Sequence, residues 1–571
     1  MSGQVHYEVF VRRTPQAPWR LEMATEDRAH AMASAEEMMT EGRAAAVRVT
    51  KETLDPDSME FTSVTLLTKG AAEETKRRPQ RDPNADPVCT GPQDLYNSPA
   101  REKIQRLLDD WLRRNRATPF ELLHRPDLVE KLEASGMELQ HAIQKIAVPE
   151  SQYSGQPVHE IIRAYQRLTE QAIERVIKAG RGQAFPPLDA GNIGAVAKKL
   201  AGHNDRLFLL GGSVSAAIAD CATWHEKVDR LLDLAEAAPE EPQPRALCQV
   251  VIEQPLAEIV GSRAGLADLL GDAQDLGASL AALVRIAAPK EVDALIQVDK
   301  SLARLIPELT GPARRLGERL NAGDFKLLGT VLARRVLSEL TGPRRLRPSD
   351  PKGEIEILRG LAMSLTASAG RLLSLEEVQN AFVERSKAIV QADFVEAYLG
   401  QGTSAITEAQ LLVKLCENVA GSANKRQAAR WLMGCVAALR FEKEFRAAGD
   451  SGPQRLAILA ELQRTVHRCD LPEKEAREIA ARVGEVGGLV EADVKICAQL
   501  SRAQAPAVQK LSALLRLASG ESAPAGPAAD RAKAEVMKLM RVPEVRNELL
   551  GSPEAATKMR PLLQMAGLLA A

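Results

Sequence analysis

Strand-like alternation of apolar and polar residues is confined to the first 70 residues of this 571-residue chain. Residues 6–12 and 19–23 alternate in this way on either side of a turn that contains Pro15 and Pro18, which predicts a β-hairpin. The segments after residue 97 show the three- and four-residue apolar spacing of helices instead. The chain therefore combines a small α+β module with a long helical body, and its fold class is predicted to be mainly α.

The small module, residues 1–70, has the predicted order ββαββ. Residues 27–41 carry alanine and methionine at helical spacing, and Gly42 supplies a stop at the C-terminal end of that helix. Two further strands are expected at residues 45–49 and 61–68, separated by the turn-forming sequence Asp-Pro-Asp-Ser. An edge of such a sheet can pair with a strand of a partner, or the module only caps or dimerises the protein.

Residues 71–97 are polar and rich in proline, so we expect a disordered linker there. The basic run at residues 76–81, Lys-Arg-Arg-Pro-Gln-Arg, is diluted by acidic neighbours. We interpret it as part of the solvated linker rather than as an anion-binding patch.

The remainder is predicted to be an all-helical body, either an irregular bundle or a helical-repeat-like array. Residues 118–121 (Thr-Pro-Phe-Glu) and 374–377 (Ser-Leu-Glu-Glu) have the capping pattern of helix starts. Breaks rich in glycine and proline near residues 346–353 and 520–527 predict domain boundaries. These boundaries give helical domains at 98–348 and 349–520, followed by a flexible segment and C-terminal helical tail at 521–571.

One internal similarity supports a repeat. Residues 302–312 contain Leu-Ala-Arg followed by Glu-Leu-Thr-Gly-Pro, and residues 332–343 contain the same elements 30 to 31 positions later. That period is close to one helical hairpin, and each Thr-Gly-Pro fits the end of a helix. Two copies leave both a repeat segment and a coincidence within an irregular bundle open.

The composition excludes several classes of function. Aromatic residues make up only 3% of the chain and the formal net charge is −1, so neither base stacking on aromatic platforms nor global steering towards nucleic acid is expected. The seven cysteines are scattered and never form Cys-x-x-Cys, which indicates reduced thiols in the cytoplasm. No apolar window approaches the length of a transmembrane helix, so no membrane association is expected.

Two groups of residues have metal-like spacing. Cys221 and His225 are four apart and would share one helix face, but the sequence offers no second pair at plausible spacing. Asp268, Asp272 and Asp275 would also share a helix face and could hold Mg²⁺. We interpret the first pair as a core cysteine beside a boundary histidine, and the acidic group as a solvated face.

The glycine-containing segment 210–215, Leu-Gly-Gly-Ser-Val-Ser, lacks the ending of a phosphate-binding loop and the second glycine of a nucleophile elbow. We interpret it as a helix break packed tightly against a neighbour. The sequence therefore predicts no catalytic residue, no metal ligand and no cofactor.

Residues 301–360 are locally basic, with twelve Lys or Arg against seven Asp or Glu, a net charge of +5. An acidic protein, a nucleotide or another phosphate-bearing ligand could dock on this segment, or it could serve only as a solubilising surface. The candidate partner- or anion-binding residues are Arg314, Arg315, Arg334, Arg335, Arg344, Arg345 and Arg347.

The C-terminal residues Leu569, Ala570 and Ala571 resemble the ending of bacterial tagging peptides that an ATP-dependent unfoldase-protease recognises. The resemblance covers three residues and implies regulated proteolysis of the chain. In a chain rich in alanine and leucine, chance occurrence explains the same ending.

We expect a non-catalytic cytoplasmic adaptor, scaffold or regulatory protein that binds another protein through its helical body. Two alternatives stay open: a helical enzyme or small-ligand sensor whose site is assembled from distant residues, and a self-assembling structural protein that forms homo-oligomers. A buried pocket with several ionisable groups of shifted pKa would favour the enzyme or sensor, whereas a long apolar groove or a free sheet edge would favour the adaptor.

Overall fold

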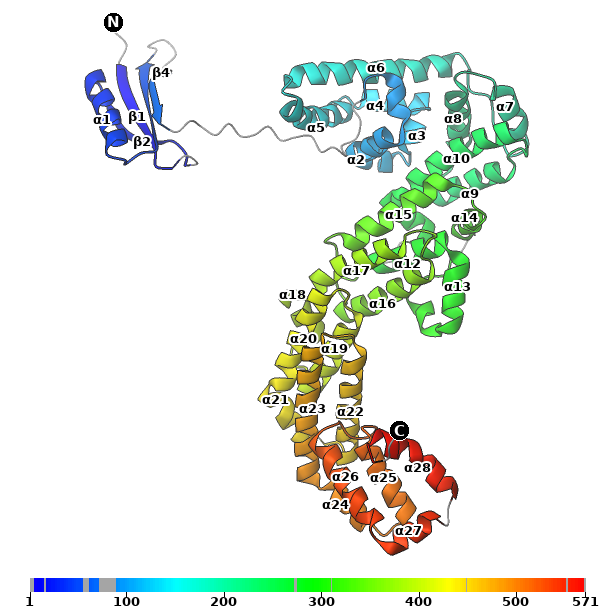
Figure 1. The fold of residues 1–571 in the computed structure, drawn as a ribbon. Coiled ribbons are helices and arrows are strands. Elements are labelled where there is room, and N and C mark those ends of the chain that lie inside the picture. The colour runs from blue at the N-terminus through cyan, green and yellow to red at the C-terminus, as the bar shows by residue number, and fades with distance from the viewer. Residues whose placement is uncertain are drawn as a thin grey trace. The chain divides into compact units, whose positions relative to one another are not determined.

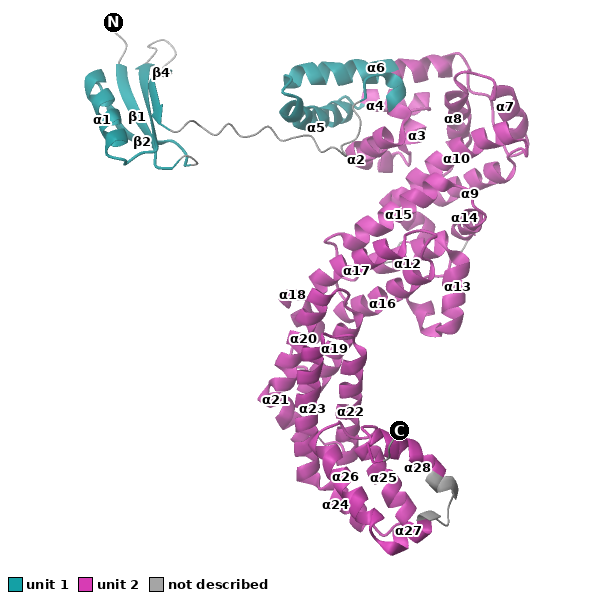
Figure 2. Cartoon of the chain, in the orientation of Figure 1, with its two compact units in different colours: residues 1–94, 135–171 teal, residues 95–134, 172–571 magenta. Residues whose placement is uncertain are grey.

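The computed structural model describes residues 5–14, 17–54, 61–70, 89–271, 275–309, 311–447, 449–550 and 553–568. Within them the chain forms four strands and is otherwise mainly helical (Figure 1). It divides into two compact units, residues 1–94 with 135–171, and residues 95–134 with 172–571 (Figure 2).

The N-terminal module has the predicted ββαββ order and forms one antiparallel sheet with strand order β2-β1-β3-β4. Its elements are β1 (Val5–Arg12), β2 (Arg20–Thr25), α1 (Arg28–Thr40), β3 (Ala46–Leu54) and β4 (Phe61–Gly70). The Asp27 carboxylate caps α1 by accepting hydrogen bonds from the backbone N–H groups of Ala29 and His30. Val9 on β1 lies opposite Val49 on β3, and both belong to the buried core of the module.

The two faces of the sheet differ in chemistry. Helix α1 packs on β1, β2 and β3, and Ala31 and Ala35 of α1 are buried in that core. On β1 and β3, Phe10 and Arg48 form a cross-strand pair at the alternate positions, which face away from this core. The Arg48 guanidinium lies 5.0 Å from the ring centroids of both Phe10 and Trp19. Strands β2 and β4 are the edges of the sheet.

The prediction of disorder across residues 71–97 is wrong for the C-terminal end of this segment. Residues 71–88 lie outside the described part of the chain, but Pro92–Tyr96 form a short 3₁₀ helix, η1. The Tyr96 hydroxyl donates a hydrogen bond to the Leu123 carbonyl oxygen at 3.0 Å. An aromatic side chain that packs against the helical body orders this end of the segment despite its polar composition.

Helices α2 to α15 lie on both sides of the boundary between the units. Their bounds are α2 (Ser98–Arg114), α3 (Pro119–Leu122), α4 (Pro126–Ala134), α5 (Met137–Ser154), α6 (Val158–Arg181), α7 (Ile193–Leu200), α8 (Arg206–Ala217), α9 (Trp224–Glu236), α10 (Pro242–Gly261), α11 (Arg263–Leu270), α12 (Leu276–Ala287), α13 (Pro289–Val298), η2 (Lys300–Arg304), α14 (Gly311–Asn321) and α15 (Lys326–Thr341). Helix α5 and the first part of α6 belong to the first unit, where the Tyr165 hydroxyl donates to the Glu150 carboxylate at 2.8 Å.

The C-terminal helices all belong to the second unit. Their bounds are α16 (Pro351–Ala367), α17 (Leu375–Ile389), α18 (Ala392–Leu399), α19 (Ala405–Asn418), α20 (Ser422–Ala437), α21 (Leu439–Ala447), α22 (Gly452–Arg468), α23 (Glu473–Val494), α24 (Ile496–Arg502), α25 (Ala507–Ala518), α26 (Pro527–Met540), α27 (Pro543–Leu550) and α28 (Pro553–Met565). Both capping boxes expected from the sequence, at Thr118 and Ser374, are present.

The second unit contains a two-layer helical array. In the first layer each helix packs on the next in the series α10, α15, α17, α20, α23 and α26. In the second layer each helix packs on the next in the series α9, α14, α12, α16, α19 and α22. Helix pairs such as α19 with α20 and α22 with α23 connect the layers. In α15, Leu328, Leu332, Val336 and Leu340 recur every four residues and are each 0% exposed, so one apolar stripe supplies the packing face.

The buried core of this array continues across residues 348 and 520, where the sequence predicts domain boundaries. The compact units therefore follow a different division from the predicted 98–348, 349–520 and 521–571. The start of the predicted flexible tail is also packed, because Ala523 is fully buried and Gln463 both donates to and accepts from the backbone of Ala525. Neighbouring helices supply contacts that glycine and proline content does not reveal.

The two Thr-Gly-Pro copies do not occupy equivalent positions. Gly311, in the left-handed region at φ +51°, begins α14, so Pro312 lies in the first turn where its missing N–H costs no helical hydrogen bond. Gly342 follows the end of α15 with an extended backbone at φ −72° and ψ 167°. The prediction that both copies end helices is wrong for the first, because proline is compatible with both places.

Candidate functional site

The seven arginines proposed as a binding surface come from three places in the second unit. Arg314 and Arg315 lie in α14, Arg334 and Arg335 in α15, and the other three in the segment between α15 and α16. The structure divides them by their partners into four that connect helices and three that are mainly exposed.

Arg315 shows the connecting role most clearly. Its guanidinium forms ion pairs with three carboxylates of α9: with Asp229, with Asp233 at 2.7 Å and with Glu236 at 3.0 Å. Burial opposes the charged form, but the hydrogen bonds to these carboxylates outweigh it and raise the pKa of Arg315. Arg315 thus connects α14 to α9 and has little free capacity for a ligand.

Arg335, Arg345 and Arg347 are also used inside the fold. Arg335 donates to the carbonyl oxygens that end α10, at Val260 and Gly261, a favourable place for a cation at the negative end of a helix dipole. Burial lowers the pKa of Arg335. Arg345 pairs with Glu354 at 3.0 Å, and Arg347 pairs with Asp275 at 2.7 Å.

Arg314, Arg334 and Arg344 have side chains that are 58%, 63% and 51% exposed. Each forms one surface ion pair: with Glu308 at 3.4 Å, Glu102 at 2.7 Å and Glu339 at 3.6 Å respectively. The pairs of Arg314 and Arg334 are exposed on both sides and contribute about 0–1 kcal/mol. The Glu339 carboxylate is 19% exposed, but its pair with Arg344 is the longest of the three, so a partner can replace all three pairs at low cost. These three arginines are the members of the predicted surface that remain accessible.

Arg314 also lines a cavity of about 480 Å³ between α12, α13 and α14. Two of the cations that line it are neutralised in place, because Arg285 pairs with Asp293 and Arg314 with Glu308. The lining is therefore close to neutral and does not by itself select an anion.

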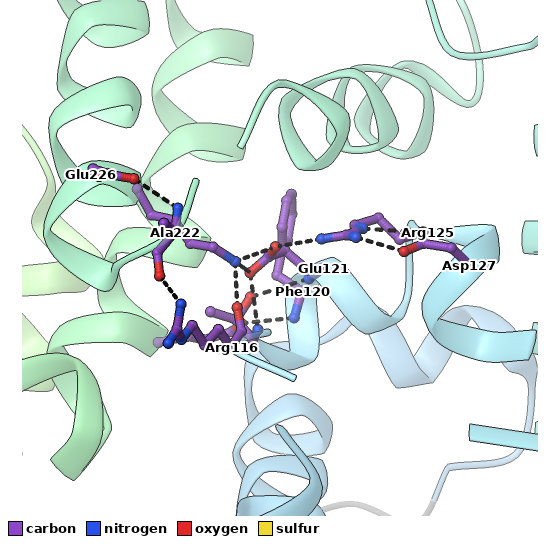
Figure 3. Close-up of polar contacts among 10 residues, drawn as sticks. Arg116, Phe120, Glu121, Arg125, Asp127, Ala222 and Glu226 are labelled. Carbon is purple, nitrogen blue, oxygen red and sulfur yellow. Dashed lines mark hydrogen bonds and ion pairs between the residues drawn. The ribbon is translucent and has the colours of Figure 1, made fainter. Parts of the chain in front are cut away.

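A buried ionic cluster that the sequence analysis missed lies where α3 meets α9 (Figure 3). The Lys227 ammonium donates to both carboxylate oxygens of Glu121, at 2.7 and 2.9 Å, and to the Arg116 carbonyl oxygen. The side chains of Lys227 and Glu121 are 2% and 0% exposed. Arg125 and the Thr118 N–H also donate to Glu121. The capping box identified Glu121 from sequence, but nothing local indicated Lys227, 106 residues away.

A second ion pair extends this cluster. Arg101 donates to Glu258 at 2.6 Å, and the Phe120 N–H donates to the same carboxylate at 2.7 Å. Burial raises the pKa of Glu258 while Arg101 opposes the shift, and burial lowers the pKa of Lys227. The cavity beside Glu258 holds only about 10 Å³, room for about one water molecule. The cluster connects α2, α3, α9 and α10, and its carboxylates are occupied by protein donors.

The expectation that each metal-like group shares one helix face is wrong for Cys221 with His225 and for Asp268 with Asp275. Cys221 precedes the N-cap residue of α9 whereas His225 lies in its first turn, so they do not share a helix face. Asp268 lies in α11, but Asp275 caps α12, and Asp272 lies outside the described residues. Across the described part of the chain, no group of three or more His, Cys, Asp or Glu could hold a metal ion.

The glycine-containing segment 210–215 lies inside α8, so the predicted helix break is wrong. The predicted tight packing is confirmed: a Cβ at Gly211 would lie 2.5 Å from the His124 ring, and one at Gly212 would lie 2.1 Å from the Phe185 ring. Two glycines are tolerated within the helix because aromatic rings occupy the space of their side chains.

The proposed degradation signal, Leu569, Ala570 and Ala571, lies outside the described residues. A search of the described helices for a span long and apolar enough to cross a membrane found none.

Comparison with known proteins gives no family for this chain. No protein-family model matches it, and no curated protein matches it. One similar solved structure is described as a "Circular tandem repeat protein with novel repeat topology and enhanced subunit contact surfaces"; it is 17% identical, and the match covers 82% of this chain and 96% of that chain with a TM-score of 0.23. A TM-score of this size does not establish a shared fold.

Proposed function

We propose that this protein is a non-catalytic adaptor or scaffold that binds another protein through its helical array. The observation that supports this role is the two-layer packing of the second unit, in which one core continues through consecutive helices. Stacked helices of this type present long surfaces made of many short segments, which suits recognition of a macromolecule.

The ion pairs and hydrogen bonds that charged side chains form between helices support the same proposal. Arg315, Arg335 and the pair of Lys227 with Glu121 connect helices that are far apart in sequence. Their hydrogen bonds stabilise the framework rather than activate a nucleophile or a water molecule. The edge strands of the N-terminal sheet, β2 and β4, offer a second mode of binding by strand addition.

The accessible arginines define where an acidic partner would bind the helical array. We propose that Arg314, Arg334 and Arg344 contribute to this surface, because each is more than half exposed and its present ion pair is readily exchanged. Charge at the rim of an interface mainly sets the association rate and its dependence on salt.

Affinity capture with the full chain tests this proposal, followed by measurement of binding to the captured protein. The variant Arg314→Glu/Arg334→Glu/Arg344→Glu is expected to bind that protein at least tenfold more weakly than the wild type. A control with equal charge change is Arg426→Glu/Arg468→Glu/Arg477→Glu, whose arginines are 52%, 65% and 70% exposed and also form single ion pairs. Equal losses in both variants would contradict the assignment of the surface.

A truncated chain beginning at residue 89 separates the helical array from the sheet while keeping the ordered Tyr96. Recovery of the same partner by this chain is the expected result. Recovery of nothing but further copies of the protein by the full chain would refute the adaptor role and favour self-assembly.

A further inference from the structure

A cavity of about 240 Å³ lies in the second unit where three segments distant in sequence meet. Its walls come from residues 299–305, from α16 and from α19, with Tyr398 of α18 added. Leu302, Ile355 and Tyr398 are buried, so they give the cavity an apolar floor. The Tyr398 hydroxyl already donates to the Leu411 carbonyl oxygen at 3.2 Å, which fixes this side chain in place.

Four cations from the three segments surround this floor: Arg304, Lys352, Arg359 and Lys414. Lys352 and Arg359 are seven residues apart in α16 and therefore lie on one face of that helix. Lys414 comes from α19, across the cavity lining. Among the described residues, neither Lys352 nor Lys414 has an ion pair or side-chain hydrogen bond, although each is beside the same cavity.

Three carboxylates share the lining with these cations. Glu356 pairs with Arg304 at 3.1 Å. Asp299 accepts hydrogen bonds from the hydroxyl and N–H groups of Ser301, and these bonds, followed by the charges of Arg359 and Arg304, lower its pKa. Glu417 lies three residues after Lys414 in α19 and lines the same cavity. The lining thus holds four cations against three carboxylates, a net charge of +1, and among the described residues the ammonium groups of Lys352 and Lys414 form no ion pair.

We propose that this cavity binds a small phosphate monoester, with Lys352, Lys414 and Arg359 binding the phosphate and the apolar floor contacting its organic group. Phosphate oxygens are strong acceptors for both ammonium and guanidinium groups. The volume is below the range of about 300–1,000 Å³ typical of pockets for drug-sized ligands, which favours a ligand smaller than a nucleotide. This ligand site goes beyond the proposed adaptor role and does not depend on it.

Isothermal titration calorimetry of the full chain with phenyl phosphate at low ionic strength tests the site. We expect one molecule bound per chain, weaker binding of inorganic phosphate, no binding of phenol, and loss of affinity as salt is added. The variant Lys352→Met/Lys414→Met should weaken phenyl phosphate binding at least tenfold, because each lysine contributes a charge-assisted hydrogen bond. The control Lys443→Met/Lys474→Met changes the net charge equally on α21 and α23, outside the cavity lining, and should bind like the wild type.

Three outcomes would overturn the proposal. The wild type could fail to bind phenyl phosphate, or the Lys352→Met/Lys414→Met variant, shown by circular dichroism to be folded, could bind it as well as the wild type does. A phosphoserine peptide that bound through the same two lysines at least tenfold more tightly than phenyl phosphate would assign the site to a phosphorylated protein instead of a free small molecule.

Discussion

The buried ion pair between Lys227 and Glu121 carries the sharpest prediction of stability. Lys227→Met keeps most of the side-chain volume but removes the ammonium that donates to Glu121 at 2.7 and 2.9 Å. Water cannot replace it, because the Glu121 side chain is 0% exposed. Breaking a buried ion pair by removing one partner costs about 3–5 kcal/mol. Arg125 and the Thr118 N–H still donate to Glu121, so we expect a loss of about 3 kcal/mol, at the lower end of this range.

A matched control isolates the effect of burial. Lys198 pairs with Glu241 at 2.6 Å, a similar distance, but these side chains are 52% and 54% exposed. Exposed ion pairs contribute about 0–1 kcal/mol, so Lys198→Met should change stability by no more than that. The two substitutions are chemically identical and differ in the exposure of the ion pair that they break.

Two measurements read out the effect. Urea unfolding followed by tryptophan fluorescence is sensitive to this region, because the Lys227 ammonium lies 5.2 Å from the centroid of the Trp224 ring. Hydrogen exchange of α3 and α9 then localises the loss of protection. The double variant Glu121→Gln/Lys227→Met should recover part of the loss, because it removes the uncompensated carboxylate. Equal costs for Lys227→Met and Lys198→Met, or strictly additive costs in the double variant, would refute this reasoning.

Two further predictions concern pH and packing. Burial lowers the pKa of His124 from 6.5 to about 3, so the native state keeps the imidazole neutral while the unfolded chain binds a proton as pH falls below 6.5. We therefore expect the free energy of unfolding, measured by urea titration at each pH, to decrease by about 2 kcal/mol between pH 6.5 and 5. This decrease should be absent from the variant His124→Asn. An unchanged decrease in that variant would contradict its assignment to His124. Gly484→Ala places a Cβ 2.3 Å from the Ala525 carbonyl oxygen and should cost about 1–3 kcal/mol. Gly434→Ala, inside α20 with nothing within 4 Å of its Cβ, should raise stability by about 0.5–1 kcal/mol. Thermal unfolding of the two alanine variants compares them, and a loss of equal size at Gly484 and Gly434 would argue against the predicted clash at Gly484.

Structural features that depend only on residues close together in the sequence were predictable from it. The alternation in residues 6–12 and 45–49 correctly indicated β1 and β3, because strand faces follow a two-residue period. Thr118 and Ser374 correctly indicated helix starts, since a capping box forms within four residues. Gly311 shows the limit of such patterns: proline after glycine is compatible with either end of a helix, and packing placed it at the start of α14.

The candidate sites were less predictable because they depend on pairs far apart in the chain. The sequence identified a basic segment but could not show that Arg315 would face the acidic side of α9, more than 80 residues away. It could not show that Lys352 and Lys414, from α16 and α19, would line one cavity. Local chemistry alone thus determined the ββαββ module, the helical body and its helix starts. The stacking of the helices decided which charges became internal connections and which stayed exposed, because the energy of an ionic group depends on the partners and the solvent that the tertiary fold leaves around it.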